Sequence, residues 1–178
     1  MTKQEYFLLK LIASVPNIVG RKKLQKLVYL IKFAGVPFES SYTWHYYGPY
    51  SADLALQIDT LVNKGFLDEM FSIGYTYRIT DEGKNLLQRI EENTANRSVV
   101  GFLSPWTREF SSLAQFRVSD LEKASSVLFW MDWGKASKEA IRTTEIQKGK
   151  LTTCAINITK KVKNLKTADS PIEPESNL

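Results

Sequence analysis

The chain has 178 residues, of which 43% are apolar and 12% aromatic, so it is long enough to bury one large hydrophobic core or two small ones. Its formal net charge of +5 permits a nucleic-acid partner without requiring one, because a mild excess of charge is common in proteins. Cys154 is the single cysteine, which excludes an internal disulfide and a cysteine-based metal site. No apolar stretch reaches the roughly 20 residues of a membrane helix, and the N-terminus lacks a signal-peptide pattern. We therefore expect a cytoplasmic protein without a membrane partner.

Two helices are predicted first. Residues 2–5 form a capping box with Thr2 as the cap, which starts a helix that ends near residue 15. Residues 21–34 carry a broad apolar stripe at helical spacing, which predicts a second helix buried on more than one face. The basic residues Lys22 and Lys26 on this helix are expected to face water.

An aromatic segment follows at residues 42–50. Its aromatic and β-branched side chains predict a short strand that ends in a turn at Gly48-Pro49. Because alternate residues of a strand face inward, we expect these aromatic side chains to pack in the core, together with the sole histidine, His45. Ser51 is a good N-cap for a third helix that continues to residue 64.

Residues 66–79 predict a two-stranded ribbon. Residues 75–79 alternate in polarity as a half-buried strand does, and residues 66–67 begin its partner. Thr80 then caps a fourth helix that runs to about residue 92. This order is the layout of a winged helix-turn-helix. The expected fold class is therefore mainly α (α+β), a winged helix-turn-helix with a small β-ribbon wing, followed by a helical C-terminal half.

The second half of the chain predicts further helices. The Ser-Pro pair at residues 104–105 suits a helix start, and residues 119–122 form a second capping box. The expected organisation has four parts: a winged-helix domain at 1–92, a linker at 93–98, a helical region for packing or oligomerisation at 99–166, and a disordered tail at 167–178.

Four segments carry a resemblance to a known family: residues 20–30 (GRKKLQKLVYL), 45–51 (HYYGPYS), 65–67 (GFL) and 77–83 (YRITDEG). Together they resemble the YwgA-like family of small prokaryotic proteins. The first two segments also resemble, more distantly, the Panacea (SocA-like) antitoxin domain. The resemblance covers residues 1–92 well and the helical half loosely. It implies a winged-helix fold and a regulator-like or antitoxin-like binding role, and it carries over no catalytic residue.

The first functional hypothesis is a non-enzymatic winged-helix protein that binds double-stranded DNA and regulates transcription. A groove-reading helix presents polar and basic side chains, and basic residues around it position the protein on phosphates. A winged-helix repressor usually binds as a dimer, and the C-terminal helices are available as the homodimer interface. The candidate contacts are Arg21, Lys22, Lys23, Lys26, Gln57, Asn63, Lys64 and Arg78. The first four of these residues form a basic cluster at 21–26. The alternative is that this cluster is only the solvated beginning of a helix and contacts no phosphate.

The outer face of the third predicted helix supports a different hypothesis. Asp59 would repel phosphates there, and Leu56 is apolar where bases should be. The alternative function is therefore a protein-interaction adaptor or antitoxin in a prokaryotic defence or toxin-antitoxin module, with Leu56 and Asp59 in contact with the partner. A cluster of nine basic and two acidic residues at 135–166 leaves an RNA-binding accessory factor as a third interpretation.

No catalytic or metal site is predicted. His45 has neither the His and Cys companions of a metal site nor a carboxylate or nucleophile placed toward it by spacing. The glycines are scattered singly, so no phosphate-cradling loop is present. We expect no enzymatic activity, no metal and no cofactor.

Overall fold

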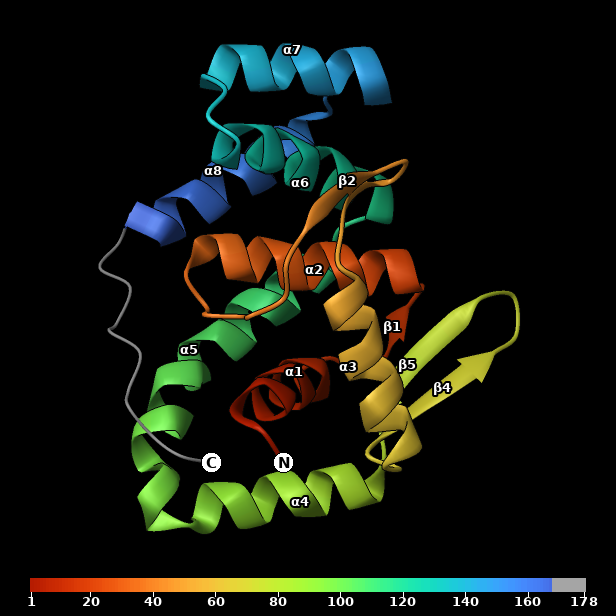
Figure 1. Cartoon of the computed structure of the whole chain (residues 1–178), viewed down its shortest axis with the longest axis vertical. Coiled ribbons are helices and arrows are strands. Elements are labelled where there is room, and N and C mark those ends of the chain that lie inside the picture. Colours follow the sequence, from red (N-terminus) through yellow and green to blue (C-terminus); the bar gives the residue numbers. More distant parts are fainter. Residues whose placement is uncertain (168–178) are drawn as a thin grey trace.

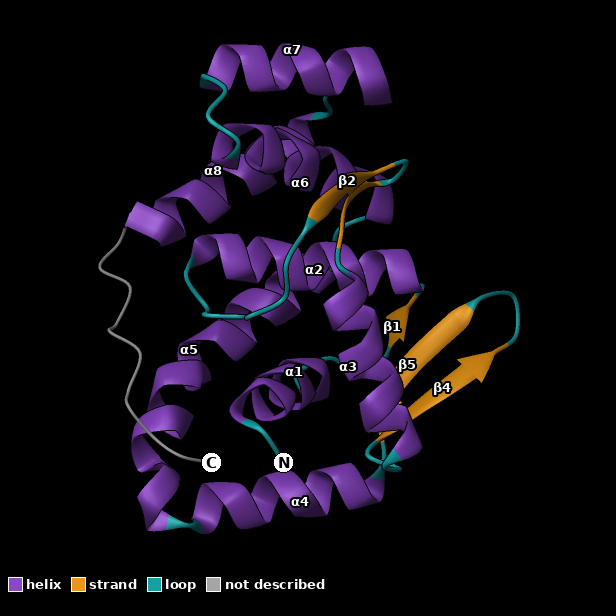
Figure 2. Cartoon of the chain, in the orientation of Figure 1, coloured by secondary structure: helices purple, strands orange, loops and turns teal. Residues whose placement is uncertain are grey.

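The computed structural model describes residues 1–167, which form a mainly helical protein with a small antiparallel sheet (Figures 1 and 2). The tail expected at 167–178 lies outside the described residues, apart from Thr167 at the end of the last helix. Within the described range, no helix combines the length and apolarity needed to cross a membrane. The elements are α1 (Lys3–Ala13), β1 (Ile18–Val19), α2 (Arg21–Ala34), β2 (Thr43–His45), β3 (Gly48–Tyr50), α3 (Ala52–Asn63), β4 (Leu67–Phe71), β5 (Tyr75–Ile79), α4 (Asp81–Glu92), the 3₁₀-helix η1 (Thr94–Asn96), α5 (Arg97–Ala114), α6 (Val118–Asp132), α7 (Ser137–Lys148) and α8 (Thr153–Thr167).

The predicted N-caps of the first half are confirmed. The Thr2 hydroxyl accepts a hydrogen bond from the Glu5 amide, and the Glu5 carboxylate accepts one from the Thr2 amide, which completes the capping box of α1. Ser51 accepts from the Leu54 amide at the start of α3. Thr80 caps α4 in the same way. These short side chains satisfy amides that a helix leaves unpaired at its N-terminus.

The predicted ribbon is confirmed as the antiparallel pair β4–β5, with Leu67 opposite Ile79 and Phe71 opposite Tyr75. Strand β4 is longer than expected, because the acidic residues in its middle weaken the strand signal in the sequence. The two-residue strand β1 pairs with β5 and gives the sheet order β1-β5-β4. Figure 2 shows this sheet on one side of the molecule, away from the separate β2–β3 hairpin.

The aromatic segment forms a hairpin, so part of its prediction is wrong. Gly48 and Pro49 belong to strand β3 and pair with β2, and the turn lies at Tyr46 and Tyr47. As turn residues, these two tyrosines point out of the fold, and Tyr46 is 78% exposed. His45 is also exposed, contrary to the expectation that it lies in the core.

A single hydrophobic cluster connects the two halves of the chain, with α2 in its middle (Figure 1). The ring of Phe7 in α1 stacks on Phe102 in α5, with centroids 6.0 Å apart. On the other side of α2, Tyr29 packs 6.4 Å from Phe129 in α6. Each such burial contributes about 1.5–3 kcal/mol, so the helical half supplies part of the core of the first half. The residues expected to be a linker, 93–98, form η1 and the first residues of α5.

In the second half, one predicted helix start and one predicted capping box are wrong. Pro105 lies inside α5, where it removes one backbone hydrogen bond, that to the carbonyl of Gly101. The helix continues through it because the neighbouring Leu103 and Trp106 are buried in the core. Helix α6 starts one residue before Ser119, without a side-chain cap, and the Asp120 carboxylate instead accepts a hydrogen bond of 2.5 Å from Thr152.

Candidate functional site

Arg21 connects α2, α3 and the β4–β5 ribbon. Its guanidinium donates to both carboxylate oxygens of Glu69 at 2.8 and 3.0 Å, and it lies 3.9 Å from the Asp59 carboxylate. It also stands 4.2 Å from the centre of the Tyr75 ring. The hydrogen bond to Glu69 raises the pKa of Arg21 further above its already high value. Burial, and then the hydrogen bond that its hydroxyl donates to Glu69, raises the pKa of Tyr77. Arg21 is thus committed to acidic partners within the protein.

Lys26 is buried, contrary to the expectation that it faces water. It is only 1% exposed, and its ammonium donates a 2.6 Å hydrogen bond to the Pro49 carbonyl. Burial lowers its pKa to about 7, although the nearby Glu122 opposes this effect. The helix lies at the centre of the molecule and is covered on several sides, so two of its polar residues, Gln25 and Lys26, are enclosed. Lys26 therefore holds the hairpin against α2 and does not lie on the outer surface of the protein.

Gln25 has a similar role, which sequence reasoning missed. Its side-chain amide donates to the Ser51 carbonyl at 2.8 Å, and its oxygen accepts from the Ser51 amide at 3.0 Å. Gly48 has a φ of +81°, and a Cβ at this position would lie 2.8 Å from the Ser126 hydroxyl. The segments 20–30 and 45–51 are therefore complementary parts of one packing arrangement. The occurrence of both segments in one chain was the sequence signal that could have indicated this packing.

Lys22 and Lys148 share one carboxylate. Their ammonium groups lie 3.0 and 3.1 Å from the two oxygens of Glu122 in α6. Burial pushes the pKa of Glu122 upward, but the hydrogen bonds from both lysines outweigh burial and hold this pKa below its usual value. Lys22 also stands 4.3 Å above the Tyr47 ring, and Lys148 donates to the Tyr46 carbonyl. This cluster ties α2, the hairpin, α6 and α7 together.

The remaining candidate DNA contacts are scattered. Lys64 pairs with Glu5 at 2.6 Å, and Arg78 pairs with Asp68 at 3.3 Å. Burial lowers the pKa of Lys23, whereas Asn63 is exposed. Gln57 is partly buried, and its side-chain oxygen has no hydrogen-bond partner in the described part of the chain. The candidates do not form a continuous surface of uncompensated positive charge.

Apolar side chains are exposed beside these ion pairs. Leu56, on the outer face of α3, is 68% exposed, and Phe71 and Ile73 at the ribbon tip are 72% and fully exposed. Asp59 lies one turn after Leu56, and its carboxylate reaches the Arg21 guanidinium. This guanidinium stands over the Tyr75 ring. The centre of the Tyr75 ring lies 5.1 Å from the centre of the Phe71 ring. These contacts define a surface from α3 to the ribbon, two elements that lie beside each other in Figure 1. We name it the α3–ribbon surface and define it by Arg21, Leu56, Asp59, Glu69, Phe71, Ile73 and Tyr75.

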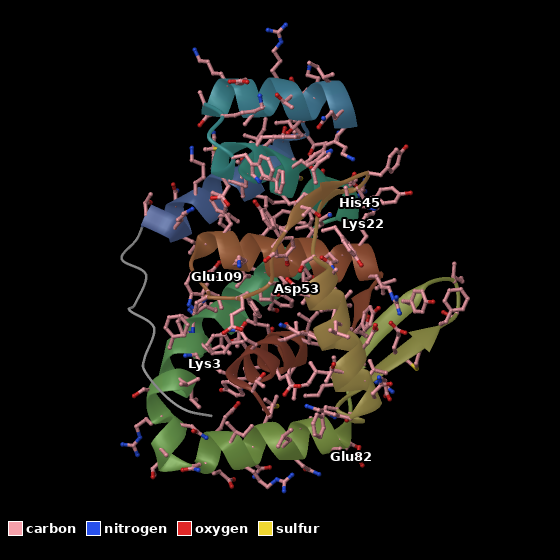
Figure 3. The ribbon with its side chains drawn as sticks, in the orientation of Figure 1. Lys3, Lys22, His45, Asp53, Glu82 and Glu109 are labelled. Atoms are coloured by element: carbon pink, nitrogen blue, oxygen red, sulfur yellow. The ribbon has the colours of Figure 1, made fainter. Side chains whose placement is uncertain are left out.

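A pocket of about 210 Å³ lies behind this surface, between the first two turns of α2, helix α3 and the β2–β3 hairpin. Lys22 from α2 and His45 from the hairpin both line it, and both are labelled in Figure 3. We name it the α2 pocket. No group of three or more His, Cys, Asp or Glu side chains suited to a metal ion occurs among residues 1–167.

Comparison with known proteins identifies one informative relative. No family model matches the chain. The chain is 40% identical over 96 residues to a Bacillus subtilis (strain 168) protein named "Uncharacterized protein YwgA". The match covers 51% of this chain and 58% of that relative's length. It supports the YwgA-like resemblance of the motifs described above.

Proposed function

We propose that this protein is a winged helix-turn-helix protein that acts by binding another protein. The order of α1, β1, α2, α3, β4 and β5 supports the fold, as does the sheet order β1-β5-β4, in which β4 and β5 form the wing beside α3. The β2–β3 hairpin occupies the place of the short turn between the second and third helices.

The observation that carries the proposal is the character of the α3–ribbon surface. In a DNA-binding winged helix, this face would meet phosphates and base edges, which favour uncompensated basic and polar side chains. Here its central cation, Arg21, is neutralised by Glu69 and Asp59, while Leu56 on α3 and Ile73 at the ribbon tip expose apolar area. Exposed apolar patches with polar neighbours are typical of protein interfaces.

Electrostatics favour the same conclusion. Asp53 and Asp59 are both exposed on α3, and a DNA backbone would repel them. Asp53 accepts a 2.8 Å hydrogen bond from the Ser41 amide, so it also fixes the loop before the hairpin. A partner with an apolar contact region and a basic rim fits this surface. An antitoxin that binds a toxin, as the family resemblance implies, is one form of this role.

Affinity purification of the full chain from its native host tests the proposal. We expect one protein to be recovered in a fixed ratio, and to be lost with Leu56→Arg and with Ile73→Asp. Ile146→Asp is the matched control, because Ile146 is as exposed as these residues but lies on α7. Recovery of no partner, or equal loss with all three variants, would contradict protein binding at this surface.

A second candidate is sequence-dependent DNA binding by a transcription regulator. It is favoured by the same arrangement of α3 and ribbon and by the net charge of +5. An electrophoretic shift assay with genomic fragments at low and moderate salt distinguishes it, since each phosphate contact adds about −0.9 to the slope of log affinity against log salt. A complex that weakens with salt and with Lys23→Glu would support DNA binding. Light scattering would then establish whether the protein is a homodimer.

A further inference from the structure

Around the α2 pocket, four basic side chains meet three carboxylates, which leaves an excess of one positive charge when Lys26 is protonated: the bases are Arg21, Lys22, Lys26 and Lys148, and the acids are Asp59, Glu69 and Glu122. Lys22 and Lys26 line it, and Lys148 lies behind Lys22 on the shared carboxylate of Glu122. The Glu122 carboxylate is thus the acidic group nearest to the ammonium groups of Lys22, Lys26 and Lys148. Among the described residues, none lies within ion-pair distance of the Lys26 ammonium, which donates to the Pro49 carbonyl. An anion in this pocket would complete the charge balance.

The backbone adds to this field. The pocket lies along the first two turns of α2, whose first turn contains no acidic residue and whose N-cap, Gly20, provides no side-chain hydrogen bond. The unpaired amides of a helix N-terminus carry partial positive charge. Arg21 adds nothing to this excess, because it meets two carboxylates, those of Glu69 and Asp59, and Asp59 itself lines the pocket.

Flat rings form another wall of the pocket. His45 and Tyr50 lie with ring centroids 5.5 Å apart, and Tyr47 stands beneath the Lys22 ammonium. All three side chains are exposed toward solvent, and within residues 1–167 the His45 ring takes part in no hydrogen bond. Exposed rings next to cations bind flat ligands by stacking, with the cations available to a charged substituent.

The geometry points to a binding site in the α2 pocket for a small ligand that joins a flat ring to an anionic group. This chemistry is shared by mononucleotides and aromatic acids. The ring lies against Tyr47 and Tyr50, and the anionic group contacts Lys22 and Lys26. The site goes beyond the proposed function and does not rest on it. Its residues form the wall of the pocket, and only Arg21 and Asp59 also belong to the α3–ribbon surface.

Isothermal titration calorimetry with the full chain tests this assignment. The probes are adenosine monophosphate and 4-hydroxybenzoate, each of which joins a ring to an anion, compared with adenosine and inorganic phosphate, which carry only one of the two groups. We expect at least one of the first pair to bind at least about tenfold more tightly than either half-probe, since both parts of the site are then used. Binding of adenosine monophosphate alone identifies the nucleotide class, and binding of 4-hydroxybenzoate alone identifies the acid class.

Variants locate the binding. Lys22→Met and Tyr47→Ala each remove one contact from a partly or fully exposed position, so the fold is retained, which circular dichroism checks. Each is expected to weaken binding about tenfold or more, whereas Lys138→Met, the same charge change on exposed α7, leaves it unchanged. Failure of both anionic ring probes to bind at millimolar concentration overturns the assignment. Equal affinity of wild type and both pocket variants does the same.

Discussion

The buried Lys26 provides a quantitative test of how α2 is enclosed. Lys26→Met keeps an unbranched side chain of similar length and removes the ammonium. The Pro49 carbonyl then lacks the hydrogen-bond donor that lies 2.6 Å away in the wild type, which costs about 1–3 kcal/mol. The variant also removes the penalty of burying a charged group. Because only the wild type carries this titrating group, the difference in stability between the two proteins must depend on pH.

The sign and size of this dependence follow from the pKa of Lys26. Burial lowers the pKa to about 7 in the folded protein, whereas its ordinary value is 10.5. Between these pH values the unfolded chain binds more protons than the folded one, so the free energy of unfolding rises with pH. The slope is about half of 1.4 kcal/mol per pH unit at pH 7 and approaches that full value above it, so the wild type gains about 2 kcal/mol relative to Lys26→Met between pH 7 and pH 9. The gain is absent below pH 7 and complete above 10.5.

Urea denaturation followed by tryptophan fluorescence measures this difference for both proteins at several pH values from 6 to 9. Other groups that titrate in this range are present in both chains and cancel in the difference. Glu122, which faces Lys26, has a lowered pKa and stays ionised throughout. Lys138→Met, which removes an exposed lysine on α7, is the matched control for the loss of a positive charge. A constant difference between wild type and Lys26→Met across this range would refute the buried position of the ammonium.

Further predictions concern contacts within the first half and between the two halves. Gln25→Ala removes two buried hydrogen bonds to Ser51 and should lower the unfolding free energy by about 2–4 kcal/mol in urea titrations. Gly48→Ala places a Cβ on a residue with positive φ and only 2.8 Å from the Ser126 hydroxyl. It should lower the unfolding free energy by about 2–3 kcal/mol in the same assay. An unchanged unfolding free energy would contradict the hairpin geometry. A fragment of residues 1–96 lacks the part of the core that α5 and α6 supply. Because its tertiary packing is then incomplete, we expect weak near-ultraviolet circular dichroism and broad proton resonances. A cooperative unfolding transition of the fragment would instead establish an autonomous first domain.

The sequence by itself determined the local elements of this protein. The caps at Thr2, Ser51 and Thr80, the helix at 21–34 and the paired strands of the ribbon were all predicted correctly. Each depends on neighbours a few residues apart, because capping hydrogen bonds and alternating polarity act over such short distances. The exposed Leu56 was likewise predictable from its position on the outer face of the third helix.

Only the tertiary structure decided which side chains remain available for binding. Lys22 and Glu122 are separated by 100 positions in the chain, and Arg21 and Glu69 by 48, so no local pattern indicates that they pair. Lys26 looks like a solvent-facing lysine on an amphipathic helix until the hairpin and α6 enclose it. The charge of a residue is a property of the sequence. Whether a partner meets that charge depends on which distant segments lie beside it, because neutralisation and desolvation act through space.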